Sequence, residues 1–215
     1  MTQLPPAIPS DEYASVLDGP EVETKVKGSR FLGQAFRADD AESAGLAIAR
    51  VRKQYHDATH HCSAYRVGTP ESAEERSDDD GEPSGTAGVP ILGAIRRDDL
   101  FGVFIVVTRY YGGTKLGTGG LVRAYGDSAR EALAVAPRRT VWREATFEID
   151  STYEDVGAVE AILAREGRHL RKVEREFLDR VRFRVTLLRS QGPSLFSILQ
   201  EGTAGRAEVR EMTSM

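Results

Sequence analysis

The sequence predicts an α+β protein with two domains. Segments of strand-like composition and segments with helical spacing of apolar residues are intermingled, and the pattern starts afresh after residues 137–143. The length of 215 residues suits one large or two small domains, and an apolar content of 40% is sufficient for a core. We therefore expect a flexible, proline-rich arm at residues 1–20, a first domain at residues 21–139 and a second domain at residues 144–215.

The first domain is predicted to alternate strands with helices. Stretches rich in β-branched and aromatic residues predict strands over residues 22–38 (two strands, broken near Gly28), 59–67 and 101–108. Helical spacing of apolar residues predicts helices over residues 41–56, 91–97 and 121–136. Residues 68–90 are expected to form a long polar loop, because glycines and prolines interrupt them repeatedly.

The second domain is predicted to follow the order β-α-β-β-α-β, which is the ferredoxin-like plan. Its first helix is expected to open with a capping box of Ser151 and Glu154 and to stop at Gly167. The strands are predicted over residues 145–149, 169–177, 180–188 and 207–210, with a short second helix over residues 195–199. A sheet of this kind leaves one face open to water or to a partner.

Several classes of protein are disfavoured by the composition. The longest apolar run is Val103 to Val107, far short of the roughly 20 residues of a membrane-spanning helix. Residues 1–9 lack the charged start and apolar stretch of a secretory signal. Cys62 is the single cysteine, so no internal disulfide can form. We expect a cytoplasmic protein that does not enter a membrane.

Charge is distributed unevenly along the chain, whose formal net charge is −4. Residues 69–84 contain seven acidic residues and one basic residue, whereas residues 85–139 contain eight basic and four acidic residues. An acidic loop therefore precedes a locally basic segment, although charge counting alone is equally consistent with ordinary surface variation.

The most informative segment is a glycine-rich turn at residues 109–123. It has five glycines within nine positions, between a predicted strand and a predicted helix. Glycine permits positive φ and the close approach of a ligand, and a helix N-terminus offers unpaired N–H groups to an anion. Basic residues can bind phosphate and tyrosines can stack on bases. The candidate anion- or nucleic-acid-binding residues are Arg109, Tyr110, Tyr111, Gly112, Gly113, Lys115, Gly117, Gly119, Gly120 and Arg123.

Other interpretations of the turn and of the neighbouring histidines stay open. The turn fits neither a P-loop nor a dinucleotide fingerprint, and it could simply be a strand-to-helix turn that packs tightly. His60 and His61 are adjacent on a strand and point to opposite faces, so they cannot easily share a metal. We add His61 to the candidate site as a histidine that meets a ligand phosphate. Cys62 is expected to be a small buried side chain.

Asp79, Asp80 and Glu82 lie in residues 77–88, which include the end of the acidic loop. The loop fails the EF-hand pattern, because Ala87 stands where the pattern requires glutamate. A weak Mg²⁺ site, a solvated loop capped by Asp and Ser turns, and an acidic cluster that pairs with Arg109, Lys115 or Arg123 all remain open. We assign these three acids to support of the loop, and expect no metal and no cofactor.

Four segments together resemble the YigZ/IMPACT family. They are residues 27–31, 58–65, 79–88 and 109–125, and their order and spacing fit the family across residues 22–135. Asp78 departs from the pattern, since family members usually carry Ser or Asn there. The resemblance implies a first domain similar to a domain of a ribosomal small-subunit protein, to domain IV of elongation factor G and to GHMP kinases. It implies a second domain similar to domain V of elongation factor G.

The first functional hypothesis is a binding protein for nucleic acid, specifically RNA or a ribosome-linked partner, with a role in regulating translation. One alternative is an enzyme of phosphoryl or nucleotide chemistry, in which the turn holds phosphate and the acids of the loop hold Mg²⁺. The other is a protein-interaction module that acts through the ferredoxin-like domain. The sequence favours binding over catalysis, and leaves the ligand and the oligomeric state open.

Overall fold

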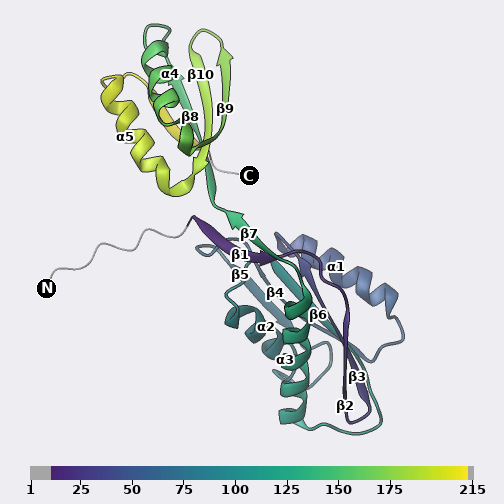
Figure 1. Ribbon diagram of the computed structural model, residues 1–215. Coiled ribbons are helices and arrows are strands. Elements are labelled where there is room, and N and C mark those ends of the chain that lie inside the picture. Colours follow the sequence, from purple (N-terminus) through teal and green to yellow (C-terminus); the bar gives the residue numbers. More distant parts are fainter. Residues whose placement is uncertain (1–10, 213–215) are drawn as a thin grey trace, which may run out of the picture. The chain divides into compact units, whose positions relative to one another are not determined.

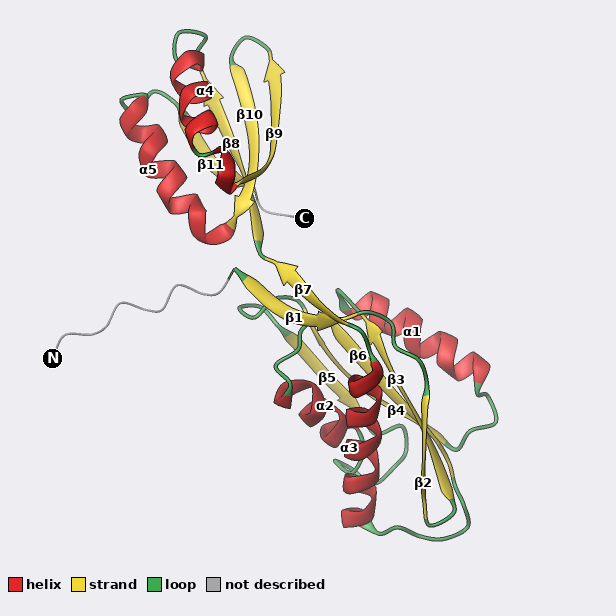
Figure 2. Cartoon of the chain, in the orientation of Figure 1, coloured by secondary structure: helices red, strands yellow, loops and turns green. Residues whose placement is uncertain are grey.

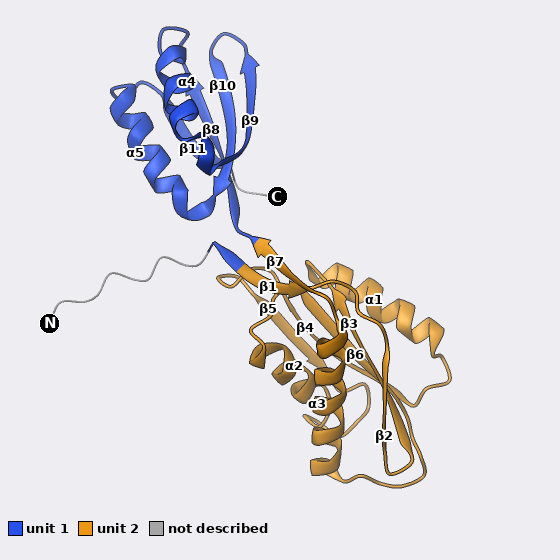
Figure 3. Ribbon diagram, in the orientation of Figure 1, with its two compact units in different colours: residues 1–12, 142–215 blue, residues 13–141 orange. Residues whose placement is uncertain are grey.

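The computed structural model describes residues 11–212, and they divide into two compact units (Figures 1 and 3). The N-terminal unit consists of Tyr13–Val141. The C-terminal unit consists of the described residues from Trp142 onward, together with residues 11 and 12. The mixture of helices and strands confirms the predicted α+β class.

The N-terminal unit is built on a five-stranded antiparallel sheet in the order β2-β3-β6-β4-β5. Its strands are β2 (Val22–Val26), β3 (Ser29–Arg37), β4 (His60–Val67), β5 (Glu74–Asp78) and β6 (Val103–Tyr110). β6 is central and buried along almost its whole length. Because successive side chains of a strand point to opposite faces, this sheet contributes to two separate cores.

Helices cover both faces of this sheet (Figure 2). α1 (Ala41–Gln54) packs on one face over Phe36 and Phe104. α2 (Gly88–Arg97) and α3 (Thr118–Val135) pack on the other face over Phe31 and Ile105. The apolar stripe of α1 faces the sheet, and a capping box of Asp40 and Ser43 begins the helix.

The C-terminal unit confirms the predicted β-α-β-β-α-β order. Its antiparallel sheet has the strand order β11-β8-β10-β9, with a core of its own. The elements are β8 (Glu144–Ser151), α4 (Val156–Arg165), η1 (Gly167–His169), β9 (Leu170–Phe177), β10 (Val181–Leu188), η2 (Arg189–Gln191), α5 (Gly192–Gly202) and β11 (Glu208–Met212). Numbered along this unit, the strands lie in the order 4-1-3-2, as the ferredoxin-like plan requires.

The predicted flexible arm differs from the structure over the residues that the structure describes. Glu12–Val16 forms β1, which pairs with β7 (Arg138–Trp142) in a two-stranded sheet. Val16 is fully buried in the core beneath α2 and α3, and this burial explains why the segment is held. Residues 1–10 of the predicted arm lie outside the described part of the chain.

Three further predictions need correction. The long polar loop contains β5, an edge strand of mostly charged residues, whose composition hides its strand character. α3 begins at Thr118, three residues earlier than predicted. The capping box of Ser151 and Glu154 does not form, because α4 begins only at Val156 and the side chain at its N-cap, Asp155, accepts bonds from Arg206 instead.

Of the helices in the described part of the chain, none is both long enough and apolar enough to cross a bilayer.

Candidate functional site

The candidate residues gather at one end of the sheet in the N-terminal unit. β6 ends there and β4 begins, and the pairing places His60 opposite Arg109. The turn between β2 and β3 also reaches this end, where the Gly112 amide donates to Ser29 Oγ at 3.2 Å. The amide of Tyr111 donates to Thr59 Oγ1 at 3.0 Å. The start of the glycine-rich turn is therefore tied to two neighbouring strands, and α3 begins within the turn at Thr118.

Packing or backbone conformation requires glycine at some positions of the turn, but not at all of them. A Cβ added at Gly112 would lie 1.9 Å from the carbonyl carbon of Gly28, so the two backbones touch. Gly113 and Gly117 have φ values of 83° and 71°, which favour glycine. At Gly119 φ is not positive, and an added Cβ would meet nothing within 4 Å. Tight packing explains Gly112, whereas no contact within residues 11–212 explains Gly119.

Arg109 belongs to a buried network rather than to the surface of the turn. Its side chain is 6% exposed and forms an ion pair with Glu82 at 2.5 Å. It also donates to Ser29 Oγ at 3.2 Å. Burial raises the pKa of the Tyr125 hydroxyl, which stays protonated and donates to the same Glu82 oxygen at 2.7 Å. Of the alternatives left open for the acidic loop, this arrangement agrees with the one in which an acidic residue, here Glu82, pairs with Arg109.

The other two acids of the loop also bond to protein groups. Asp79 accepts the amides of Gly85, Ala87 and Gly88 at 2.7–3.0 Å. Burial raises the pKa of the Asp79 carboxyl, but the three amides together lower it by a larger amount. The net shift of its pKa is therefore downward. Asp80 accepts the His61 amide at 2.6 Å and a guanidinium N–H of Arg52 at 2.6 Å. The loop is held by its own carboxylates, next to the start of α2.

His61 and Cys62 do not join the turn. His61 lies on the face covered by α1 and is 7% exposed, with Nε2 3.1 Å from the carbonyl of Tyr55. Burial lowers the pKa of His61, so the ring is neutral at neutral pH. Burial raises the pKa of the Cys62 thiol, and this disfavours the thiolate that nucleophilic chemistry requires. His60 is the histidine of this pair that faces the network, with Nε2 3.8 Å from Glu82.

The solvent side of the turn is basic and carries an uncapped helix start. The first backbone bond of α3 runs from Leu121 N to Gly117 O at 2.9 Å, and no side chain caps the helix. The amides of residues 118–120 therefore have no intrahelical acceptor. Lys115 and Arg123 are exposed, and neither has an ion-pair partner within residues 11–212. Tyr111 is 46% exposed.

Tyr110 occupies an intermediate position. Its hydroxyl donates to Asp57 Oδ1 at 2.8 Å, and the guanidinium of Arg30 lies 5.4 Å from the centre of its ring. The hydroxyl of Tyr110 and its aromatic ring therefore both contact other residues of the protein.

Residues 11–212 contain no group of three or more His, Cys, Asp or Glu side chains placed to hold a metal ion.

Comparison with known proteins places the chain in a family. The Impact N-terminal domain matches residues 27–133, which include β3, β4, the acidic loop and the glycine-rich turn. IMPACT family member YvyE of Bacillus subtilis is 35% identical over 202 residues, which cover 93% of this chain and 90% of the relative. The chain belongs to the IMPACT family.

Two further similarities extend over both units. An IMPACT family member from Thermus thermophilus is 40% identical over 184 residues, covering 84% of this chain and 97% of the relative. A crystal structure of a hypothetical protein matches 96% of this chain and 100% of its own chain, with a TM-score of 0.69 and 28% identity. The IMPACT family resemblance read from four sequence segments is therefore confirmed.

Sequence reasoning did not assign roles to three residues of the site. Ser29, His60 and Tyr125 complete the network around Arg109 and Glu82. All three stand in the segments that carry the family resemblance, at residues 27–31, 58–65 and 109–125. Their presence in those segments could have marked them as candidate site residues. Their spacing in the sequence, however, does not predict that they contact Arg109 and Glu82.

Proposed function

We propose that this protein binds single-stranded RNA at the glycine-rich turn, in a role linked to translation. The observation that carries the proposal is the uncapped start of α3, where Gly119 leaves open space beside free amides. A helix N-terminus with unpaired N–H groups and a positive dipole end favours phosphate. The close approach that a missing Cβ allows would bring a phosphate within reach of those amides.

Charge and aromatic surface support the same class of ligand. Lys115 and Arg123 lie on either side of the start of α3 in the sequence, and both are exposed. Tyr111 presents an exposed ring on which a base can stack. The expected similarity of the two domains to domains IV and V of elongation factor G agrees with an RNA partner.

The set of contact residues in this proposal is smaller than the set predicted from sequence. Arg109 is engaged by Glu82, and His61 is buried on the other face, so the proposal assigns neither to the ligand. Arg109 instead positions the turn through Ser29, which bonds the Gly112 amide. The phosphoryl-transfer alternative gains no support, because Asp79 and Glu82 are both occupied by protein groups.

The test is RNA binding by fluorescence anisotropy across a range of salt concentrations. An oligonucleotide of about 20 unpaired nucleotides is long enough to cover such a site. We expect the affinity to fall as salt rises, with a slope near −0.7 for each phosphate contacted. The Lys115→Ala/Arg123→Ala double variant should therefore flatten the slope by about 1.4.

Arg130→Ala provides the matched control, because Arg130 lies on the same helix but pairs with Asp127. It should leave the affinity and the slope unchanged. Absence of RNA affinity at low salt, or equal effects of the control and of the double variant, would contradict the proposal. Gly119→Val should weaken binding without lowering the unfolding temperature by more than a few degrees, since its Cβ has room.

A further inference from the structure

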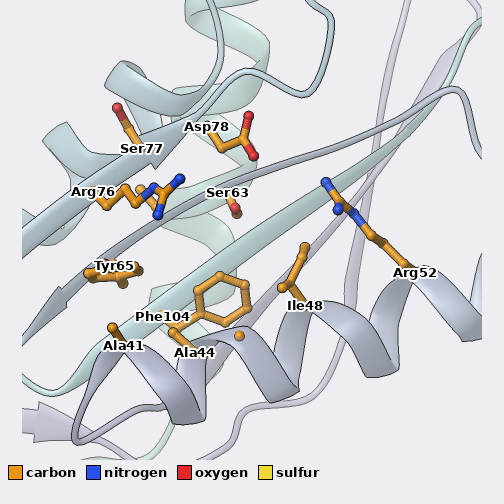
Figure 4. Close-up of a pocket in the computed structure, with 12 residues that line it drawn as sticks. Ala41, Ala44, Ile48, Arg52, Ser63, Tyr65, Arg76, Ser77, Asp78 and Phe104 are labelled. Atoms are coloured by element: carbon orange, nitrogen blue, oxygen red, sulfur yellow. The ribbon is translucent and has the colours of Figure 1, made fainter.

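A second candidate site lies on the other side of the sheet, between α1 and the edge formed by β4 and β5. A cleft of about 230 Å³ opens there (Figure 4). One wall is a single stripe of α1, at spacings of four, three and four residues: Ala41, Gly45, Ile48 and Arg52. The opposite wall comes from β4, β5 and β6, including Tyr65, Arg76 and Phe104. The cleft shares no residue with the glycine-rich turn.

The lining divides into an apolar part and a charged part. Phe104, Ile48 and the alanines of α1 form the apolar part, and the charged part consists of Arg76 and Asp78 on β5 and Arg52 on α1 (Figure 4). Two guanidinium groups against one carboxylate leave the lining with a net charge of +1. Asp78 already accepts the Asp80 amide at 2.9 Å, and Arg52 donates to Asp80 at 2.6 Å.

Arg76 is the charged group of the lining that no carboxylate of the described residues engages, and its guanidinium interacts with the Tyr65 hydroxyl beside it. No ion pair joins its guanidinium to a carboxylate within residues 11–212, and it extends toward the middle of the cleft (Figure 4). Arg76 is exposed, and its guanidinium can offer charge-assisted hydrogen bonds to an anion that enters the cleft.

Gly45 provides an independent observation. It lies in the interior of α1, where glycine destabilises a helix by about 1 kcal/mol relative to alanine. Its φ is not positive, and an added Cβ would meet nothing within 4 Å. The packing of the described residues therefore does not require glycine at this position. Its effect is to keep the helical wall of the cleft open.

We propose that this cleft binds a small organic anion with an apolar body, either a carboxylate or a phosphate ester. The apolar body would lie against Phe104 and Ile48, and the anionic group would bond Arg76. The volume is below the roughly 300–1,000 Å³ of pockets for drug-sized ligands, so the body is about the size of one aromatic ring. This site does not depend on the proposed RNA interface.

The experiment measures binding of four probes to the full chain by NMR titration. Phenyl phosphate and benzoate each combine a ring with an anion, whereas inorganic phosphate lacks the ring and benzyl alcohol lacks the charge. We expect at least one of the first two to bind about tenfold more tightly than both of the last two. Whichever binds more tightly distinguishes a phosphate ester from a carboxylate. Equal affinities for all four, or no binding at millimolar concentrations, would overturn the proposal.

Two pairs of variants locate the binding. Arg76→Met should weaken the best probe about tenfold, while Lys53→Met on the exposed side of α1 should not change its affinity. Gly45→Leu should fill the cleft and abolish binding. Gly93→Leu is its control, because Gly93 also lies in a helix, and a Cβ there also meets nothing within 4 Å.

The glycine pair also separates binding from folding. Both leucine variants should raise the unfolding temperature by about 2–4 °C, since each replaces a helical glycine by a good helix former. Loss of probe binding in Gly45→Leu alone, with both proteins stabilised, supports the site. Retention of probe binding in Gly45→Leu would overturn it.

Discussion

At Gly112 two backbones approach so closely that no side chain fits between them. An added Cβ would lie 2.1 Å from the carbonyl oxygen of Gly28 and 2.3 Å from the amide nitrogen of Ser29. We predict that Gly112→Ala lowers the free energy of unfolding by about 2–3 kcal/mol, because backbone must move to admit the methyl group. Urea unfolding followed by circular dichroism measures the change.

Gly119→Ala is the control for this prediction within the same segment. Its Cβ has open space, so the free energy of unfolding should change by less than about 0.5 kcal/mol or increase slightly. Equal destabilisation by the two alanines would show that the contact between Gly112 and Gly28 is not what distinguishes them.

The ion pair of Arg109 and Glu82 should be strongly coupled. Both side chains are at most 6% exposed, so removal of one partner leaves a buried charge without compensation. We predict that Glu82→Leu destabilises the protein by about 3–5 kcal/mol. The double variant with Arg109→Met should lose less than the sum of the single losses, by at least about 1 kcal/mol. Additive losses in the thermodynamic cycle would contradict this coupling.

His61 should make stability depend on pH. Burial lowers its pKa in the folded state below the ordinary value of 6.5, so below pH 6.5 the unfolded chain binds more protons than the folded chain. Its contribution to stability is therefore complete above about pH 6.5 and is lost as the pH falls toward the folded pKa, with a slope of at most about 1.4 kcal/mol per pH unit.

Two measurements check this prediction. The ring protons of His61 should titrate by NMR with a midpoint below 6.5, and His61→Gln should flatten the stability curve between about pH 5 and 6.5. A midpoint at or above 6.5 would show that the carboxylate of Asp80, 3.9 Å from Nδ1, outweighs burial.

At the scale of elements, the accuracy of the sequence predictions followed the strength of the burial pattern. β3, β4 and β6 were predicted within a few residues from their β-branched and aromatic residues, and α1 from the helical spacing of its apolar residues. β5 was missed because it is an edge strand with two glutamates, an arginine and an aspartate among five residues. Charged residues on an edge strand protect a sheet from pairing with other chains. Because the same residues are uncommon in strands, the composition of such a segment does not predict a strand.

The sheet of the C-terminal unit shows how neighbouring elements alter the meaning of a charge pattern. Arg182 and Arg184 alternate with apolar residues along β10, as expected for an open face. Across the strands, however, Arg182, Arg184 and Arg210 surround Glu148, whose side chain is only 6% exposed. These arginines are compensated within the sheet, so this face adds little attraction for a polyanion. The RNA proposal therefore depends on the turn in the N-terminal unit.

At the scale of the whole molecule, the sequence supplied the family, the α+β class and the order of elements in the second half, but only part of the site. The glycine-rich turn stood out because five glycines are rare in so short a segment. The engagement of Arg109 with Glu82 joins positions 27 residues apart in the chain, and no local pattern encodes a pairing of that kind. The cleft beside α1 was missed for the same reason, since Arg76 and Gly45 line one cleft only when β5 pairs with β4 at the edge of the sheet that α1 covers.

The two units should also be separable in solution. The C-terminal unit has its own core of 13 buried residues, which its four strands and two helices enclose. One residue from elsewhere in the sequence also bonds to this unit: the side chain of Asp11 accepts the Ser190 amide at 2.9 Å, and its backbone carbonyl accepts the Arg143 amide at 2.7 Å.

We predict that a fragment of residues 142–215 folds cooperatively, with a stability about 1–2 kcal/mol below that of the same unit in the full chain. Asp11→Ala in the full chain should reproduce most of this loss, because the backbone contact alone remains. Thermal unfolding followed by circular dichroism, with NMR dispersion as a check of tertiary packing, measures both effects. A fragment without a cooperative transition would mean that residues 144–215 are not an independent domain, and that the boundary predicted from sequence marks only a change of pattern.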